Sequence, residues 1–159
     1  MTTEALADQI LQKIPQAQGL YHRLILVVGP AGSGKTAALQ RIKEQTTAAL
    51  LNVNLELSRL LLDLTERQRA LQVPRLLSEI VDQTASEVVL LDNTEILFDV
   101  LLKQDPLRLL QGISRNRTLV ATWNGSFKDA HVTYAAPGHP EYRRYPARDL
   151  LVASPLTTE

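Results

Sequence analysis

A glycine-rich segment of the form G-x-x-x-x-G-K-[ST] constrains the fold more than any other feature of the sequence. It runs from Gly29 to Thr36, after an unbroken apolar run at 24–28 and before an amphipathic segment at 35–45. Such an apolar run suits a strand buried on both faces of a parallel sheet. A strand, a glycine-rich turn and a helix in this order form the context that a phosphate-binding loop requires. We therefore predict a phosphate loop at the carboxyl end of a buried strand.

The residue types in this segment each suit phosphate binding. Glycines allow backbone conformations closed to residues with a Cβ, so successive N–H groups can point at phosphate oxygens, and the helix start adds partial positive charge. Lys35 offers a mobile charge for the β- and γ-phosphates, and Thr36 offers a hydroxyl ligand for magnesium. The predicted nucleotide-binding residues are Gly29, Pro30, Ala31, Gly32, Ser33, Gly34, Lys35, Thr36 and Ala37.

Two acidic residues follow the apolar run at 88–91. Asp92 stands at the carboxyl end of this predicted strand, where open α/β sheets bind ligands, so we predict that it holds magnesium through a water opposite Thr36. Its alternative role is the N-cap of a helix predicted at 95–103. Glu95 is a candidate general base, and it is equally well explained as an acid in the first turn of that helix.

Polar and basic residues near the later strands complete the candidate site. Asn124 ends the strand predicted at 118–122 and is suited to orient the attacking water or to contact the γ-phosphate, although Asn124-Gly125 is also an ordinary turn signal. Arg143 and Arg144 precede the last predicted strand, at 150–153. A guanidinium can stabilise charge on a transferring phosphoryl group, in cis or from a neighbouring subunit, whereas most surface arginines have no such role.

The remaining pattern predicts alternating strands and helices. Pro15 is expected to end an N-terminal helix (1–15), and an alternating strand at 51–57 is expected near a sheet edge. Residues 58–84 are predicted to be helical with one break at Val73-Pro74, and Asp105-Pro106 to open a later helix. Residues 124–149 are predicted to form an irregular excursion with a short strand at 130–134. We predict one domain (1–159) of three-layer α/β class, a phosphate-loop NTPase with a mainly parallel five-stranded sheet.

Composition narrows the functional classes. The chain has no cysteine, so disulfides and cysteine chemistry are excluded, and no apolar run approaches the ~18 residues that cross a bilayer. We expect a cytoplasmic protein without membrane contact. The 17 basic and 17 acidic residues give zero net charge, which argues against strong DNA binding by the monomer. The acidic excess lies before residue 107 and the basic excess after it, which favours a C-terminal interface or phosphate-facing role.

Four segments together resemble a known family. They are Val28 to Thr36, Leu90 to Phe98, Thr122 to Gly125 and Gly138 to Tyr145. With these segments the chain resembles BrxF, the small phosphate-loop protein of type 3 BREX phage-exclusion systems, over about residues 20–153. The resemblance implies an ATP- and Mg²⁺-binding protein of the AAA+ or related additional-strand class, which acts with other BREX components in bacterial defence.

The same resemblance bears on the arginines and on hydrolysis. In AAA+ proteins an arginine before the final core strand often reaches the neighbouring subunit's nucleotide, which makes Arg143 and Arg144 the candidates here. The chain departs from that pattern in having Asn93 where the catalytic glutamate is expected, and in ending at Glu159 without a helical lid domain. Both departures predict that hydrolysis is slow or depends on a partner.

Three functional hypotheses follow from these features. The first is an ATPase, or a nucleotide-controlled switch, that assembles with itself or with other BREX components and reaches DNA only through partners or in an oligomer. The second is a small-molecule phosphate-loop kinase. The third is an adaptor that binds the nucleotide without hydrolysing it.

Overall fold

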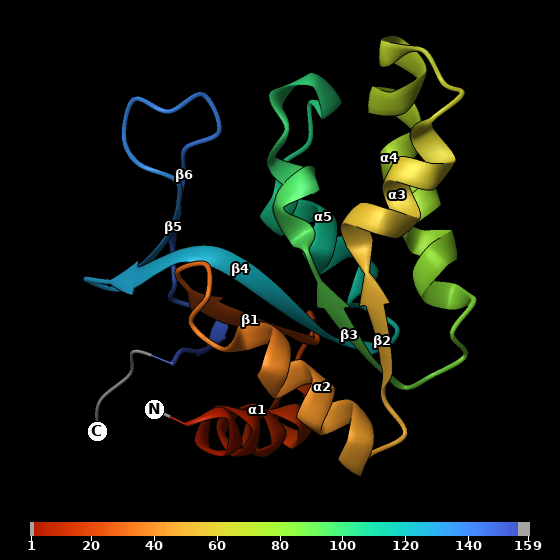
Figure 1. Ribbon diagram of the computed structural model, residues 1–159. Helices are drawn as coiled ribbons and strands as arrows, with labels where there is room; N and C mark the ends of the chain where they lie inside the picture. The colour runs from red at the N-terminus through yellow and green to blue at the C-terminus, as the bar shows by residue number, and fades with distance from the viewer. Residues whose placement is uncertain (1, 156–159) are drawn as a thin grey trace.

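The computed structural model describes residues 2–155. Helices and strands alternate along most of the chain, and two 3₁₀ segments, η1 and η2, follow β3 (Figure 1). The elements are α1 Thr3–Gln18, β1 Leu24–Gly29, α2 Lys35–Gln45, β2 Ala49–Asn52, α3 Val53–Leu61, α4 Glu66–Asp82, β3 Val88–Asp92, η1 Thr94–Phe98, η2 Val100–Leu102, α5 Pro106–Ile113, β4 Thr118–Lys128, β5 His131–Tyr134, β6 Arg143–Pro146 and β7 Leu151–Ala153. None of the helices within residues 2–155 combines the length and the apolar character needed to cross a bilayer.

Five strands form a parallel sheet in the order β2-β3-β4-β1-β7. The predicted α/β class and the mainly parallel five-stranded sheet are therefore confirmed. In this order β1 and β4 are neighbours, with Gly29 opposite Asn124, and β3 lies on the other side of β4. Since the strands are parallel, the carboxyl ends of β1, β3 and β4 meet at one edge of the sheet.

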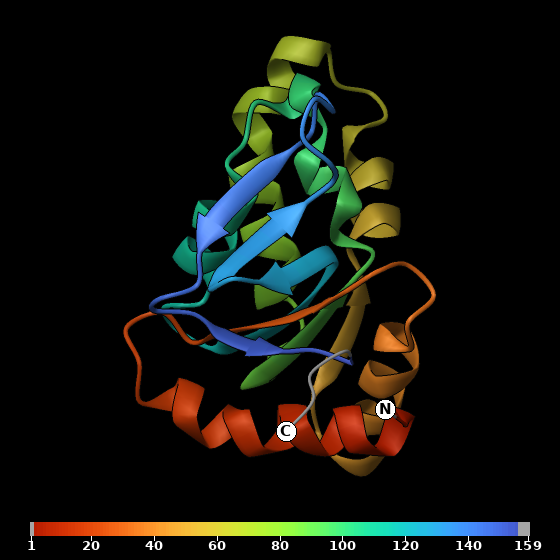
Figure 2. The same ribbon diagram turned by 90° about the vertical axis from the view of Figure 1, so that its left-hand side faces the viewer.

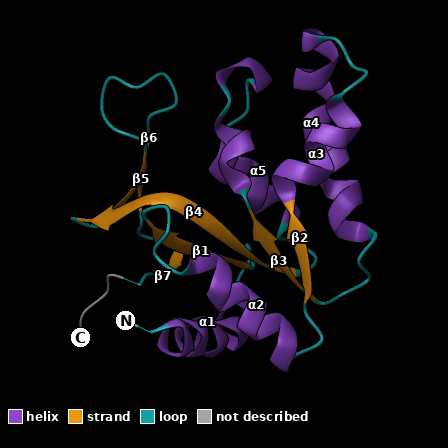
Figure 3. Ribbon diagram, in the orientation of Figure 1, coloured by secondary structure: helices purple, strands orange, loops and turns teal. Residues whose placement is uncertain are grey.

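Helices cover both faces of this sheet, which makes three layers (Figures 1 and 3). The side chains of β1 alternate between two cores because successive strand residues point to opposite faces. Ile25 and Val27 pack with α1 and α2, while Leu26 and Val28 pack in the larger core with α3, α4 and α5.

The segment predicted to be irregular is largely an antiparallel ribbon. The strand β4 continues to Lys128, well beyond the predicted end at 122, and pairs with β5, which pairs with β6 (Figure 2). The prediction of an irregular excursion at 124–149 was therefore wrong for residues 124–128, 131–134 and 143–146, which form strands, and the short strand expected at 130–134 is confirmed. The remaining residues of the segment, 129–130, 135–142 and 147–149, lie in no helix or strand.

The ribbon is anchored by aromatic packing that a search for long apolar runs does not detect. The ring of Tyr134 on β5 stacks on Phe98 at the end of η1, with 3.5 Å between ring centroids. Trp123 on β4 meets the same Phe98 edge-on at 4.9 Å. The ribbon is thus fixed to the segment that follows β3.

The strand predicted at 51–57 was wrong from Val53 onward, where α3 begins. The strand β2 ends at Asn52, whose side chain accepts a hydrogen bond from the Leu55 N–H and caps α3. Val53 and Leu57 are buried, four residues apart, whereas Leu55 is 51% exposed. The apolar residues of the alternating pattern therefore belong to two elements: Leu51 lies in the end of β2, and Val53 and Leu57 form the buried face of α3. The expected edge position is confirmed, since β2 is the outer strand of the parallel sheet.

Two prolines were misread as helix boundaries. The helix α1 continues past Pro15 to Gln18, and Pro74 lies inside α4 rather than at the start of a new helix. The true start of α4 is a capping box in which Thr65 and Gln68 satisfy each other's backbone N–H groups. A proline inside a helix costs about 3 kcal/mol. The buried residues of α1 lie on both sides of Pro15, and those of α4 run from Val73 to Val81 around Pro74, so this packing compensates for the lost hydrogen bond.

Candidate functional site

The phosphate loop connects β1 to α2 at the carboxyl edge of the sheet (Figure 1). Gly32 and Gly34 have φ values of 76° and 97°, in the left-handed region that favours glycine. Gly29 is required for a different reason: a Cβ there would lie 2.8 Å from Ser33 Oγ and 2.9 Å from a side-chain carbon of Pro155. The glycines therefore serve both backbone conformation and close packing.

Lys35 is the first residue of α2 and is almost completely buried. Its ammonium group donates hydrogen bonds to the carbonyl oxygens of Gly29 (2.8 Å) and Pro30 (2.6 Å). Burial lowers the pKa of Lys35 from its usual value, while the nearby carboxylates of Glu95 and Asp92 act to raise it. The ammonium group also donates to the Ser33 hydroxyl at 3.4 Å. A positive charge bonded to these neutral oxygens is available to the oxygens of a bound phosphate.

Asp92 ends β3 and is 8% exposed. Its Oδ1 accepts two hydrogen bonds, from the Asn93 N–H at 2.9 Å and from the Thr122 hydroxyl at 3.0 Å. The other oxygen, Oδ2, receives neither of these bonds. The predicted alternative role for Asp92, a helix N-cap, does not match the structure, because the residue before η1 is Asn93 and its side chain makes no capping bond.

Asn93 turns the chain so that Glu95 returns to the edge of the sheet. Its φ of 55° and ψ of 53° lie in the left-handed region, which asparagine enters more easily than most residues. The chain then enters η1, and Oε1 of Glu95 accepts a hydrogen bond of 3.0 Å from the Asn124 side-chain amide. Glu95 therefore reaches Asn124, where β4 passes from the parallel sheet into the ribbon, although it stands three residues after Asp92.

The phosphate loop, the carboxylates of Asp92 and Glu95, and the side-chain amide of Asn124 line one hollow of about 260 Å³. Its lining residues are Ala31, Gly32, Gly34, Lys35, Thr36, Asp92, Asn93, Glu95 and Asn124. The predicted metal ligands Thr36 and Asp92 are both among them. A hydroxyl, a carboxylate and phosphate oxygens form the donor set that magnesium prefers, so these residues fit a nucleotide-bound magnesium ion. Within residues 2–155, no group of three or more His, Asp or Glu side chains is arranged to hold a metal ion.

The two candidate arginines are not among the residues that line this hollow. Arg143 donates a hydrogen bond of 2.8 Å to the carbonyl oxygen of Gln104, in the segment between η2 and α5. Arg144 is the next residue on β6 and is exposed. Within one chain, Arg143 therefore has a structural partner, and Arg144 faces solvent.

The sequence interpretation missed two threonines beneath the acidic groups. Thr122 donates to Asp92, and its own carbonyl oxygen accepts a hydrogen bond from the Thr94 hydroxyl. Both threonines are almost completely buried. One signal was available, since Thr122 ends the apolar part of its strand as Asp92 ends β3, and neighbouring parallel strands bring such residues together.

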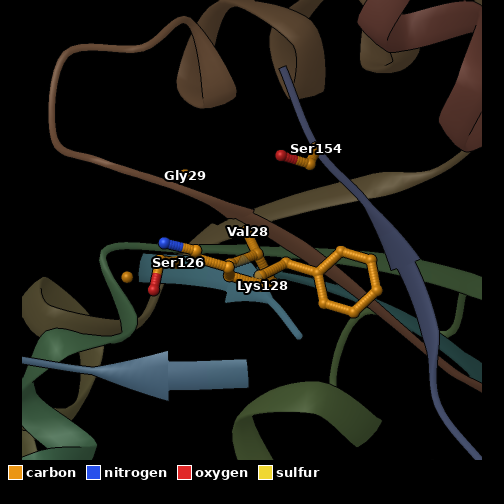
Figure 4. Close-up of a pocket in the computed structure, with 7 residues that line it drawn as sticks. Val28, Gly29, Ser126, Lys128 and Ser154 are labelled. Atoms are coloured by element: carbon orange, nitrogen blue, oxygen red, sulfur yellow. The ribbon is translucent and has the colours of Figure 1, made fainter. Parts of the chain in front are cut away.

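A second hollow of about 390 Å³ lies beside the first residue of the phosphate loop (Figure 4). Figure 4 shows Ser154, just after β7, on one side of Gly29, and Ser126 and Lys128 of β4 on the other. No carboxylate lines this hollow. The acidic chemistry of the site is therefore confined to the first hollow.

Comparison with known proteins gives little similarity. No protein-family model matches the chain, and no curated protein does. Among solved structures, the chain is similar to PCH-2 of C. elegans, with 22% sequence identity and a TM-score of 0.40. The match covers 76% of this chain and 35% of that one, so the chain spans about a third of the length of PCH-2. The function is therefore inferred from the geometry of this chain alone.

Proposed function

We propose that this protein binds ATP with Mg²⁺ at the phosphate loop and hydrolyses it slowly, as an ATPase or a nucleotide-controlled switch. One observation carries the proposal: the phosphate-loop residues Lys35 and Thr36 line the same hollow as the carboxylates Asp92 and Glu95. A glycine-rich turn that served only to connect a strand to a helix would not require two acids and a buried lysine around one hollow.

The residues divide the chemistry between them. The loop N–H groups and the start of α2 bind phosphate oxygens, and the Lys35 ammonium exchanges the Gly29 and Pro30 carbonyls for the β- and γ-phosphates. Thr36 and Asp92 hold the magnesium ion. The ion neutralises phosphate charge when it is bound.

Glu95 is the proposed general base. Its carboxylate accepts the proton of the attacking water, and Asn124 holds that carboxylate through the 3.0 Å hydrogen bond. Asn124 therefore acts as a positioning residue for Glu95, and it is also placed to contact the γ-phosphate because it lines the same hollow.

Isothermal titration calorimetry with ATP in the presence of Mg²⁺ tests the binding step. Lys35→Ala is expected to weaken ATP binding by ~10- to 100-fold, because a hydrogen bond to a charged group contributes about 1.5–3 kcal/mol. Lys43→Ala is the matched control, since Lys43 is an exposed lysine on the same helix α2. The proposal is refuted if the parent binds no ATP, or if Lys35→Ala binds as the parent does.

A non-hydrolysing adaptor is the second candidate function. It is favoured by Asn93, which stands where the AAA+ resemblance leads one to expect the catalytic glutamate. ATP binding without release of phosphate, alone or with partner proteins or DNA, would support the adaptor over the ATPase.

The kinase alternative has less support. Arg117 donates to the Ser86 carbonyl oxygen and to Asp82, so it is engaged in structural contacts and is not free to act as the arginine of a kinase lid. These contacts lie just before β3 and β4, at the amino-terminal edge of the sheet and away from the phosphate loop. Release of inorganic phosphate without transfer to an added acceptor would exclude a kinase.

The cellular role is proposed from the sequence resemblance to BrxF. We propose that the protein acts in the bacterial cytoplasm in phage defence, assembled with itself or with other BREX components, and contacts DNA only indirectly or as an oligomer. The exposed Arg144 is the better candidate to act on a neighbouring subunit's nucleotide, because Arg143 is bonded to Gln104 in its own chain. Sedimentation with and without ATP, for the parent and Arg144→Ala, tests the assembly.

A further inference from the structure

Three buried polar side chains, one of them acidic, lie together at the carboxyl ends of β3 and of the parallel part of β4. Asp92, Thr94 and Thr122 are 8%, 1% and 2% exposed. The register of the sheet explains their proximity, because Leu91 of β3 lies opposite Ala121 of β4 and the next residues are Asp92 and Thr122. Burial of hydroxyl and carboxylate groups costs free energy unless they are hydrogen-bonded to one another. Here the hydroxyl of each threonine has a partner within the cluster.

We infer that Thr122 is a positioning residue for the magnesium-binding carboxylate of Asp92, an inference that rests on the proposed nucleotide site. Oδ1 of Asp92 accepts from the Thr122 hydroxyl at 3.0 Å and from the Asn93 N–H at 2.9 Å. Two donors on one oxygen fix the orientation of the carboxylate group. Oδ2 is then left for the magnesium ion or a water bound to it. Partners of this kind orient metal ligands, and their removal weakens metal binding.

The hydrogen bonds of the Thr122 side chain, to Asp92 and at 3.4 Å to the Leu91 carbonyl oxygen, can be separated experimentally from the bond to its main-chain carbonyl. Its side chain holds Asp92, whereas its main-chain carbonyl accepts from the hydroxyl of Thr94, the residue before Glu95. Thr122→Val has nearly the same shape and keeps the main-chain carbonyl. The substitution therefore removes the contact to Asp92 and leaves the segment that carries Glu95 in place.

The test measures how strongly Mg²⁺ improves ATP binding, by calorimetric titration in EDTA and at increasing Mg²⁺ concentrations. Thr122→Val is expected to raise the Mg²⁺ concentration for half-maximal improvement by ~10-fold. Its ATP affinity in EDTA is expected to equal that of the parent, and Thr122→Ser, which keeps the hydroxyl, is expected to match the parent in both conditions. Thr118→Val is the control, because Thr118 is an equally buried threonine at the other end of the parallel segment of β4.

The outcomes separate this inference from the proposed function. Failure of the parent to bind ATP in either condition overturns the proposed function and the inference with it. If Mg²⁺ improves binding to the parent and to Thr122→Val equally, only the inference is overturned. Should Thr122→Val not fold by circular dichroism, Thr122→Ala carries the same expectation and the same overturning result. In an Asp92→Asn background, Thr122→Val is expected to have no further effect on the response to Mg²⁺.

Discussion

Replacement of Glu95 by glutamine separates proton transfer from the shape of the site. The Asn124 amide donates to Glu95 Oε1 at 3.0 Å, and the amide oxygen of glutamine can accept the same hydrogen bond. Glu95→Gln therefore retains the contact between η1 and β4. It removes only the negative charge and the ability to accept a proton.

The expected magnitude follows from these two losses. Removal of a general base lowers turnover by at least ~10²-fold, which corresponds to about 2.7 kcal/mol of transition-state free energy. Affinity for ATP is expected to stay the same or to increase slightly, because Glu95 is an anion close to Lys35, the proposed phosphate-binding residue. Turnover and affinity thus change in different ways, as expected for a group that acts on the reaction and not on binding.

The assay is single-turnover release of phosphate, with ATP affinity measured in parallel. Glu44→Gln serves as the control, because Glu44 is an exposed glutamate on the outer face of α2. A turnover for Glu95→Gln within threefold of the parent would show that Glu95 is not the base. Equal losses in Glu44→Gln would show that the effect does not depend on this site.

Three further substitutions test the local structure around the site. Asn93→Glu, which restores the usual acid, is expected to cost about 1 kcal/mol in urea unfolding without raising turnover, because left-handed backbone disfavours glutamate. Gly125→Ala is expected to lower the free energy of unfolding by about 2 kcal/mol, since its Cβ would lie 1.8 Å from the Thr133 carbonyl oxygen. Arg143→Ala is expected to destabilise the fold by about 1 kcal/mol, because it loses the hydrogen bond to Gln104, and thermal unfolding measures this loss.

The parts of the structure that the sequence predicted are those with strong local signals. The strands β1 and β3 are unbroken apolar runs, and α2 has a clear amphipathic pattern after the glycine-rich turn. These three elements place the phosphate loop and Asp92 at one edge of the sheet, so the main part of the candidate site was predictable. The position of Glu95 in the same hollow was one of two alternatives left open.

The features that escaped prediction depend on contacts between distant parts of the chain. The turn at Asn93 has no composition signal, and the contact between Glu95 and Asn124 joins residues 29 positions apart. The ribbon of β5 and β6 has few apolar residues, and its aromatic rings pack on other elements, Tyr134 on Phe98 and Tyr145 on Trp123. The alternating pattern at 51–57 suited a strand, but residues 53–61 form α3, whose first turn is capped by Asn52.

The chain has one tryptophan, and its location makes it an intrinsic optical probe of the site. Trp123 is fully buried, directly precedes Asn124 and contacts Phe98, the last residue of the segment that carries Glu95. Its indole N–H donates to the Thr133 carbonyl oxygen at 3.1 Å, which also connects it to the ribbon. A change in tryptophan fluorescence upon addition of nucleotide would therefore come from a single position, where β4, η1 and the ribbon meet. The protein can be followed by stopped-flow fluorescence without an attached dye.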